Sequence, residues 1–185
     1  ITKVKGPRTI VFDVAGIIDL KDRLVCSDPF ITVAGQTAPG KGILLREHPF
    51  GFGSEGIFRF IRLRLGKYLD KNGKTVTLDG LGAAGCDNTI IDHCSVGWTI
   101  DEAFSSRNGK NISFQRNLIS EALNQAGHQN YINAKHGYAA TIGGNVGSFH
   151  HNLLANNEGR NWSMGGGLDG AGYYAGKLDL FNNVV

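Results

Sequence analysis

A six-residue pattern that recurs along the chain constrains the fold most strongly. It reads apolar, two polar residues, Cys or Asn, any residue, and aliphatic, with a looser copy at residue 58 and an approximate one at residue 180. The copies start at residues 58, 91, 114, 149 and 180, so the intervals are 33, 23, 35 and 31 residues. Such periods are typical of solenoids. We therefore expect one rung per copy, with the variable remainder looping out on one side.

The copies have the character of strands. Each is a short β-branched or aromatic run bounded by Gly, Asn, Asp or Ser, and none is flanked by a long segment with a period near 3.6. Strands repeated at this spacing without intervening helices predict an all-β parallel β-helix, in which each rung hydrogen-bonds to the next.

The fourth position of the pattern predicts a ladder. It holds Cys94, Asn117, Asn152 and Asn183. An Asn at a sharp turn tolerates the left-handed conformation and can bond to neighbouring backbone. We expect these side chains to stack from rung to rung.

The rest of the chain alternates between short apolar runs and polar turns. Residues 35–40 form a turn, and two long irregular loops span 121–145 and 156–172; loops of this length are more often functional than idle. The segment 57–66 has no single period and is expected to bend in its middle. Further strands are expected at 9–14, 17–20, 30–34, 43–46, 75–81 and 178–185.

Length and composition set the bounds. The 185 residues suit one domain over 1–185, and the abrupt ends suggest a partial or processed chain. Charged residues are only 19%, which excludes disorder, and no apolar run reaches the length of a membrane span. A net charge of +3 without a continuous basic run argues against nucleic acid. The three cysteines match no zinc pattern and are expected as buried thiols.

Acidic residues gather around the second copy of the pattern. We expect four of them to cluster on two adjacent rungs, and such oxygen ligands without a cysteine or histidine fan favour calcium over zinc. Aspartates that only cap turns are the alternative for each single position. The four are Asp79, Asp92, Asp101 and Glu102.

The two long loops hold the candidate bases and cations. His128 and His136 are candidates for proton transfer or substrate contact, with a plain surface role equally open. Arg160 could clamp a carboxylate in a bidentate manner, or be an ordinary surface arginine.

Several segments resemble the successive motifs of secreted pectate lyases of the right-handed parallel β-helix superfamily. The likeness runs over most of the chain, and its most specific parts are IIDHCSVGWTIDE and FHHNLLANNEGRN. The other segments that carry it are GPRTIVFDVAGIIDL, ITVAGQTAPGKGI, FIRLRLG, NLISEAL and HGYAATIGG.

The resemblance implies a right-handed, single-stranded parallel β-helix that cleaves de-esterified polygalacturonate by β-elimination with bound Ca²⁺. It implies secretion, and we expect a monomer without nucleic-acid or membrane partners. The implied metal ligands are Asp79, thirteen residues before Asp92, and less securely Asp101 and Glu102. The implied catalytic base is Arg160. Candidates for contact with the substrate are His128, Lys135 and Trp162.

Two positions depart from the family pattern. Gly165 stands where many members carry a second Arg, and Thr77 where some keep another calcium-binding Asp. A guanidinium is also a poor base, because its pKa lies above about 12 unless its surroundings lower it. Lys135 and His136 are the alternative bases.

The prediction is therefore a calcium-assisted pectate lyase. The alternatives are a lyase or a hydrolase that acts on another anionic polysaccharide, for which Asp92 and the pair Asp101 and Glu102 could supply carboxylates. A third alternative is a non-catalytic carbohydrate-binding β-solenoid whose acids only cap turns.

Overall fold

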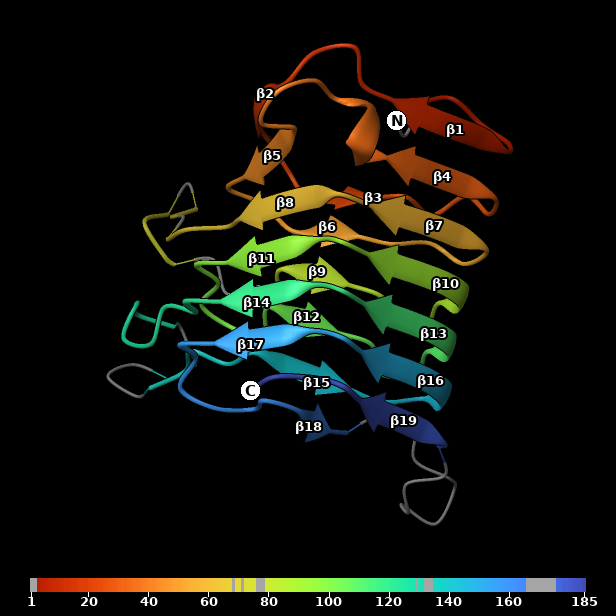
Figure 1. The fold of residues 1–185 in the computed structure, drawn as a ribbon. Coiled ribbons are helices and arrows are strands. Elements are labelled where there is room, and N and C mark those ends of the chain that lie inside the picture. Colours follow the sequence, from red (N-terminus) through yellow and green to blue (C-terminus); the bar gives the residue numbers. More distant parts are fainter. Residues whose placement is uncertain are drawn as a thin grey trace.

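The chain coils into a solenoid of parallel strands (Figure 1). The structure is a computed structural model and describes residues 3–67, 69–70, 72–75, 79–128, 130–131, 135–165 and 176–185. Each coil places one strand in each of three sheets, and strands of successive coils pair in parallel. Followed from the N to the C terminus in Figure 1, the coil is right-handed, which confirms the predicted right-handed parallel β-helix. That residues 1–185 form one domain stays a prediction.

The first sheet lies on the right of Figure 1 and contains β1 (Arg8–Val11), β4 (Ile31–Ala34), β7 (Gly56–Arg59), β10 (Asp87–Asp92), β13 (Lys110–Gln115), β16 (Asn145–His150) and β19 (Leu178–Phe181). The second sheet lies on the left and contains β2 (Gly16–Asp19), β5 (Ile43–Arg46), β8 (Ile61–Arg64), β11 (Ser95–Gly97), β14 (Leu118–Ser120) and β17 (Leu153–Ala155). The third sheet lies behind and contains β3 (Leu24–Val25), β6 (Phe50–Gly51), β9 (Leu81–Gly82), β12 (Phe104–Ser105), β15 (Ala140–Ile142) and β18 (Ser163–Met164).

The recurring pattern marks the corner between the first and second sheets. Its first position forms a column in strict register, with Ile91 paired to Phe58 and Phe114, and Phe149 following Phe114. These four side chains are fully buried. Because burial of one such side chain contributes about 1.5–3 kcal/mol, the column supplies much of the force that holds the coils together.

The predicted ladder is confirmed at this corner. The Asn117 amide oxygen accepts the Cys94 N–H at 2.7 Å, and its NH₂ donates to the Ile91 carbonyl at 3.1 Å. Asn152 and Asn183 repeat both bonds one and two coils later. The left-handed residues of the corner, however, are those one place before the ladder: Phe60, His93, Arg116, His151 and Asn182, with φ between 52° and 56°. The amides bond to the backbone of the preceding coil without being at the bend themselves.

Several local expectations hold and others do not. The bend inside 57–66 falls at Phe60, between β7 and β8. The turn at 35–40 contains a 3₁₀ helix, η1 (Gly35–Thr37); a Cβ on Gly35 would collide with the Phe60 carbonyl, so the close approach of the two coils requires glycine. The strand expected over 75–81 is wrong at its end, since Asp79 precedes the short strand β9; residues 76–78 lie outside the described part.

The two long loops also contain strands, because β15 lies within 121–145 and β18 within 156–172. The three cysteines are buried free thiols, as expected. Burial raises the pKa of Cys26 to about 11 and that of Cys94 to about 12, so these thiols are not nucleophiles at neutral pH.

Candidate active site

Three carboxylates meet at the entrance to the third sheet. Asp79 lies two residues before β9, while Asp101 and Glu102 lie just before β12. Leu81 of β9 pairs with Phe104 of β12, and the Gly80 N–H donates to the Glu102 carbonyl at 2.8 Å. Paired strands bring the preceding segments side by side, and one oxygen from each carboxylate lies within 4.8 Å of the others.

Gly80 makes this approach possible. A Cβ at this position would lie 2.8 Å from the Ala103 carbonyl oxygen and 2.8 Å from the Thr99 methyl group. A side chain here would push apart the two coils that carry the acids. The glycine therefore fixes how near Asp79 comes to Glu102.

Arg160 reaches the same place from two coils further on. Its backbone carbonyl accepts the Ala140 N–H of β15 at 3.0 Å, just before β18. The guanidinium lies over the Tyr138 ring, with its central carbon 4.1 Å from the ring centroid, and donates to Oε1 of Glu102. About a third of the side chain is exposed. Arg160 is thus tied to the group of three acids through Glu102.

Glu102 is the most firmly held of the acids. It is 2% exposed, and Oε1 also accepts bonds from Arg107 at 3.0 Å and from the Thr141 hydroxyl at 2.8 Å. Burial alone would raise its pKa, but the hydrogen bonds from Asp101 and Thr141 and the charge of Arg160 outweigh burial and lower the pKa to about 2. Glu102 is therefore a fixed negative charge at any ordinary pH.

Asp79 behaves in the opposite way. Burial and then the negative charges of Glu102 and Asp101 raise its pKa to about 7, against the weaker opposing effect of Arg107. The pKa of Asp101 is raised too, by burial and by its contact with Glu102. These raised pKa values show that the carboxylates repel one another, and a bound divalent cation would offset this repulsion.

His128 and His136 both contact the carboxylate of Asp101. Both rings are buried, at 4% and 5% exposure, and their Nε2 atoms lie 3.2 Å and 2.9 Å from the two Asp101 oxygens. Asn130 donates its N–H to Nδ1 of His128, so the proton of the neutral ring is on Nε2 and points at Asp101. That His128 contacts the substrate and that His136 is an alternative base stay predictions. In either role the ring would have to give up its hydrogen bond to Asp101.

Lys135 contacts the segment that carries Arg160. Its ammonium is 3.2 Å from Oε1 of Glu158, which lies two residues before Arg160, and its side chain is 61% exposed. Asn124 donates to the other Glu158 oxygen at 2.7 Å. Lys135 is thus accessible from solvent and linked to the segment that carries Arg160, while its catalytic and substrate-binding roles remain untested.

Trp162 points toward the core. Its ring lies 6.0 Å from that of Phe114 and 5.8 Å from that of Phe149, and its indole nitrogen is buried. These contacts give the side chain a packing position beneath β18. Its predicted contact with substrate is left as a prediction.

Asp92 does not join the other acids, so the expected cluster of four is wrong at this position. It ends β10 at the corner between the first and second sheets, where it is 2% exposed and bound by Arg59 at 2.7 Å and His93 at 2.7 Å. A strand of the second sheet lies between this corner and Asp101. Thr77, the other doubtful position, lies outside the described residues.

Three contributors to the site were not predicted from the sequence: Tyr138, Arg107 and Thr141. Arg107 is five residues from Glu102, and Thr141 pairs with Ser105 across β12 and β15. Recognising them requires the register of the third sheet. Its strands are two or three residues long, which is too short for an alternating pattern to show.

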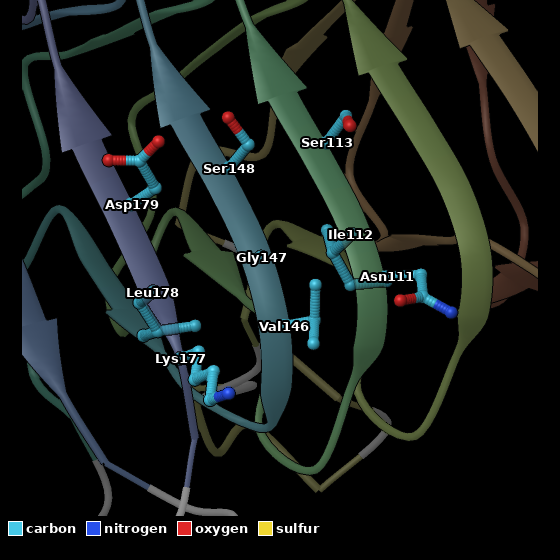
Figure 2. Close-up of a pocket in the computed structure, with 9 residues that line it drawn as sticks. All are labelled: Asn111, Ile112, Ser113, Val146, Gly147, Ser148, Lys177, Leu178 and Asp179. Atoms are coloured by element: carbon cyan, nitrogen blue, oxygen red, sulfur yellow. The ribbon is translucent and has the colours of Figure 1, made fainter.

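A groove elsewhere on the molecule can be set aside. It has a volume of about 510 Å³ and lies on the outer face of the first sheet, over β13, β16 and β19 (Figure 2). Asp179 is the acidic residue among its described lining, and none of the residues of the carboxylate group takes part. It lacks the convergent charges that a reaction on a polar substrate requires.

Almost the whole chain is similar to several fungal proteins that share one name. No family model matches it. Proteins named probable pectate lyase C from Aspergillus flavus and Aspergillus terreus are each 34% identical to it over 194 residues, which is 96% of this chain and 42% and 43% of theirs. One from Emericella nidulans is 42% identical over 119 residues, 63% of this chain and 27% of that protein.

The chain is homologous to these proteins named probable pectate lyase C. It spans about two fifths of the length of the curated relatives it matches over 96% of its own length. The parallel β-helix agrees with this relationship. Among the described residues, no helix is long and apolar enough to cross a membrane.

Proposed function

We propose that this chain carries the active site of a calcium-assisted pectate lyase, which cleaves de-esterified (1→4)-α-D-galacturonan by β-elimination. The observation that supports it best is the convergence of three carboxylates from two coils, one of which, Glu102, is bound by an arginine from a third coil. Its pectate lyase relatives favour the same chemistry. A polymeric substrate of this kind also favours action outside the cell.

The donor set fits calcium. Asp79, Asp101 and Glu102 offer oxygen atoms within 4.8 Å of one another, and hard oxygen ligands are those that Ca²⁺ prefers. When bound, the ion would neutralise the acids, attract a uronate carboxylate and stabilise the negative charge that develops next to it. The fixed charge of Glu102 would hold the ion at any ordinary pH, whereas Asp79 must first lose its proton.

His128 and His136 orient the Asp101 carboxylate for binding a cation. Two N–H donors hold its oxygens in place, so the carboxylate loses little freedom when it binds a cation. The competing reading, a transition metal bound by Asp101, His128 and His136, fits less well. The Nδ1 of His128 already accepts the Asn130 N–H, which leaves Nε2 protonated and unable to ligate.

Arg160 is the proposed proton acceptor at C5 of the uronate. Its contact with Glu102 stabilises the charged guanidinium, so Arg160 would have to leave that carboxylate and release its own proton to solvent before it could accept the proton from C5. Were Asp79, Asp101 and Glu102 to hold a cation, its positive charge would weaken the attraction between Glu102 and Arg160. Even protonated, the guanidinium would stabilise the enolate-like charge of the transition state. Lys135, which is exposed and paired with Glu158, is the alternative base.

The products formed from polygalacturonate test the proposal. A lyase gives an unsaturated uronide that absorbs in the ultraviolet, and a chelator should abolish its formation. Reducing ends without that absorbance would indicate a hydrolase, and the absence of both would indicate a binding module. Either of these results would refute the proposed reaction.

A further inference from the structure

A second groove runs along the corner between the first and second sheets, whereas the carboxylate group lies at the other end of the second sheet, just before the third. We call it the corner groove. It consists of two hollows of about 410 Å³ and 560 Å³ that share Phe60, His93 and Ser95. The second hollow follows the solenoid axis over five coils, from Phe60 to Asn182. Four rung spacings of about 4.8 Å make this stretch about 19 Å long.

The walls of the corner groove come from two rows of side chains. One wall is the row of left-handed residues at the corner, of which Phe60, His93 and Arg116 are members. The other wall is the outward row of the second sheet, in which Arg62, Ser95, Leu118 and Leu153 pair in register. Because both rows are set by the backbone repeat, the groove is straight and open at its sides.

The groove is positively charged. Lys41, Arg62 and Arg116 line it, and none of the described residues that line its two hollows is acidic. Asp92 is buried beside the wall, 2.7 Å from both Arg59 and His93, and 3.8 Å from Arg116. The positive charges outnumber that single carboxylate, so the groove attracts anions.

It also offers flat, partly exposed apolar surface. The rings of Phe60 and His93 lie parallel, 4.6 Å apart and 8° from coplanar, while Phe60 is 36% and Leu153 43% exposed. Guanidinium groups beside flat rings suit a ligand that alternates carboxylates with the apolar C–H faces of sugar rings. A uronate polymer has both features at a repeat comparable to one rung.

We propose that the corner groove is a second binding site for a uronate polymer, separate from the site of cleavage. The inference takes its ligand from the proposed function, and it would keep the enzyme on its polymer between cuts. Arg62 and Arg116 pair with uronate carboxylates, and Phe60 packs against a sugar face. The site needs no calcium, since the cations belong to the protein.

The test is electrophoresis of the native protein in gels that contain polygalacturonate and a chelator, which prevents cleavage. We expect retardation that the double variant Arg62→Gln/Arg116→Gln weakens about tenfold or more in apparent Kd, because two charge-assisted pairs are lost. Lys3→Gln/Lys110→Gln is the matched control: it also removes two exposed positive charges, and both lie outside the two sites. Unchanged unfolding midpoints would show that all variants are folded.

Equal retardation of the double variant and the wild type would overturn the proposal. So would equal retardation by DNA of matched charge, which would mean a general anion surface, or by fully methyl-esterified pectin, which carries no charge. The two proposals fail separately. Retardation without any unsaturated product would refute only the lyase, and product without retardation would refute only the corner groove.

Discussion

The asparagine ladder gives the sharpest prediction about stability. Asn117→Ala removes two buried hydrogen bonds, from the Cys94 N–H and to the Ile91 carbonyl, at a side chain that is 3% exposed. A buried hydrogen bond contributes about 0.5–1.5 kcal/mol, and a stranded buried group costs about 1–3 kcal/mol. We expect a loss of about 2–5 kcal/mol in the free energy of unfolding.

Chemical denaturation measures this loss directly, from the change in midpoint at constant slope. Asn145→Ala is the matched control, because Asn145 is exposed on β16 and its N–H bonds through the backbone alone; we expect a change within about 0.5 kcal/mol. If Asn117→Ala cost no more than Asn145→Ala, the ladder would not stabilise the coils and the argument would be wrong.

Three predictions concern the carboxylate group. Without calcium, the free energy of unfolding should fall as the pH rises from about 4 to about 7. Folding raises the pKa of Asp79 from 3.8 to about 7, so the folded state keeps this proton at a pH where the unfolded state has lost it. Thermal unfolding in chelator should show the fall, and Asp79→Asn should lessen it. Calcium titration by calorimetry at pH 6 and 8 should show tighter binding at pH 8 and proton release at pH 6; equal affinities would refute the pKa assignment. His136→Ala should weaken calcium binding several-fold, because Asp101 loses one of its two donors, and unchanged affinity would exclude a positioning role.

A further pair of variants separates charge from fold. Glu102→Gln keeps the shape of the side chain but removes the fixed charge, so it should abolish calcium binding and activity while the circular dichroism spectrum stays that of a β-helix. Arg160→Ala should abolish activity yet leave calcium bound. A fully active Arg160→Ala would show that another group takes the proton.

The sequence predicted the first and second sheets because their strands meet at a corner with fixed chemistry. A buried Phe followed three places later by Asn occurs at Phe114 and at Phe149, and Leu180 takes the place of Phe in the last copy. The third sheet has no such signature, since its strands are two or three residues long and need no alternation. Its arrangement is fixed by the strands before and after it.

The site could be predicted only in part for the same reason. Asp79, Asp101, Glu102 and Arg160 come together as expected, although nothing in their spacing shows that Arg160 spans two coils. Asp92 was misplaced because proximity in sequence to Asp101 does not tell which corner of the coil a residue occupies. The same local ambiguity hid the bonds of His128 and His136 to Asp101, which join residues 27 and 35 positions apart.

A structure of the protein with calcium and an oligogalacturonate would show whether the carboxylates and Arg160 act on the same sugar. We expect one ion on the carboxylates of Asp79, Asp101 and Glu102, about 2.3–2.6 Å from their oxygens and from a uronate carboxylate. We also expect that Arg160 has left Glu102 and faces C5 of the sugar. An ion or a cleavable sugar bound elsewhere, with Arg160 still on Glu102, would contradict the proposed reaction.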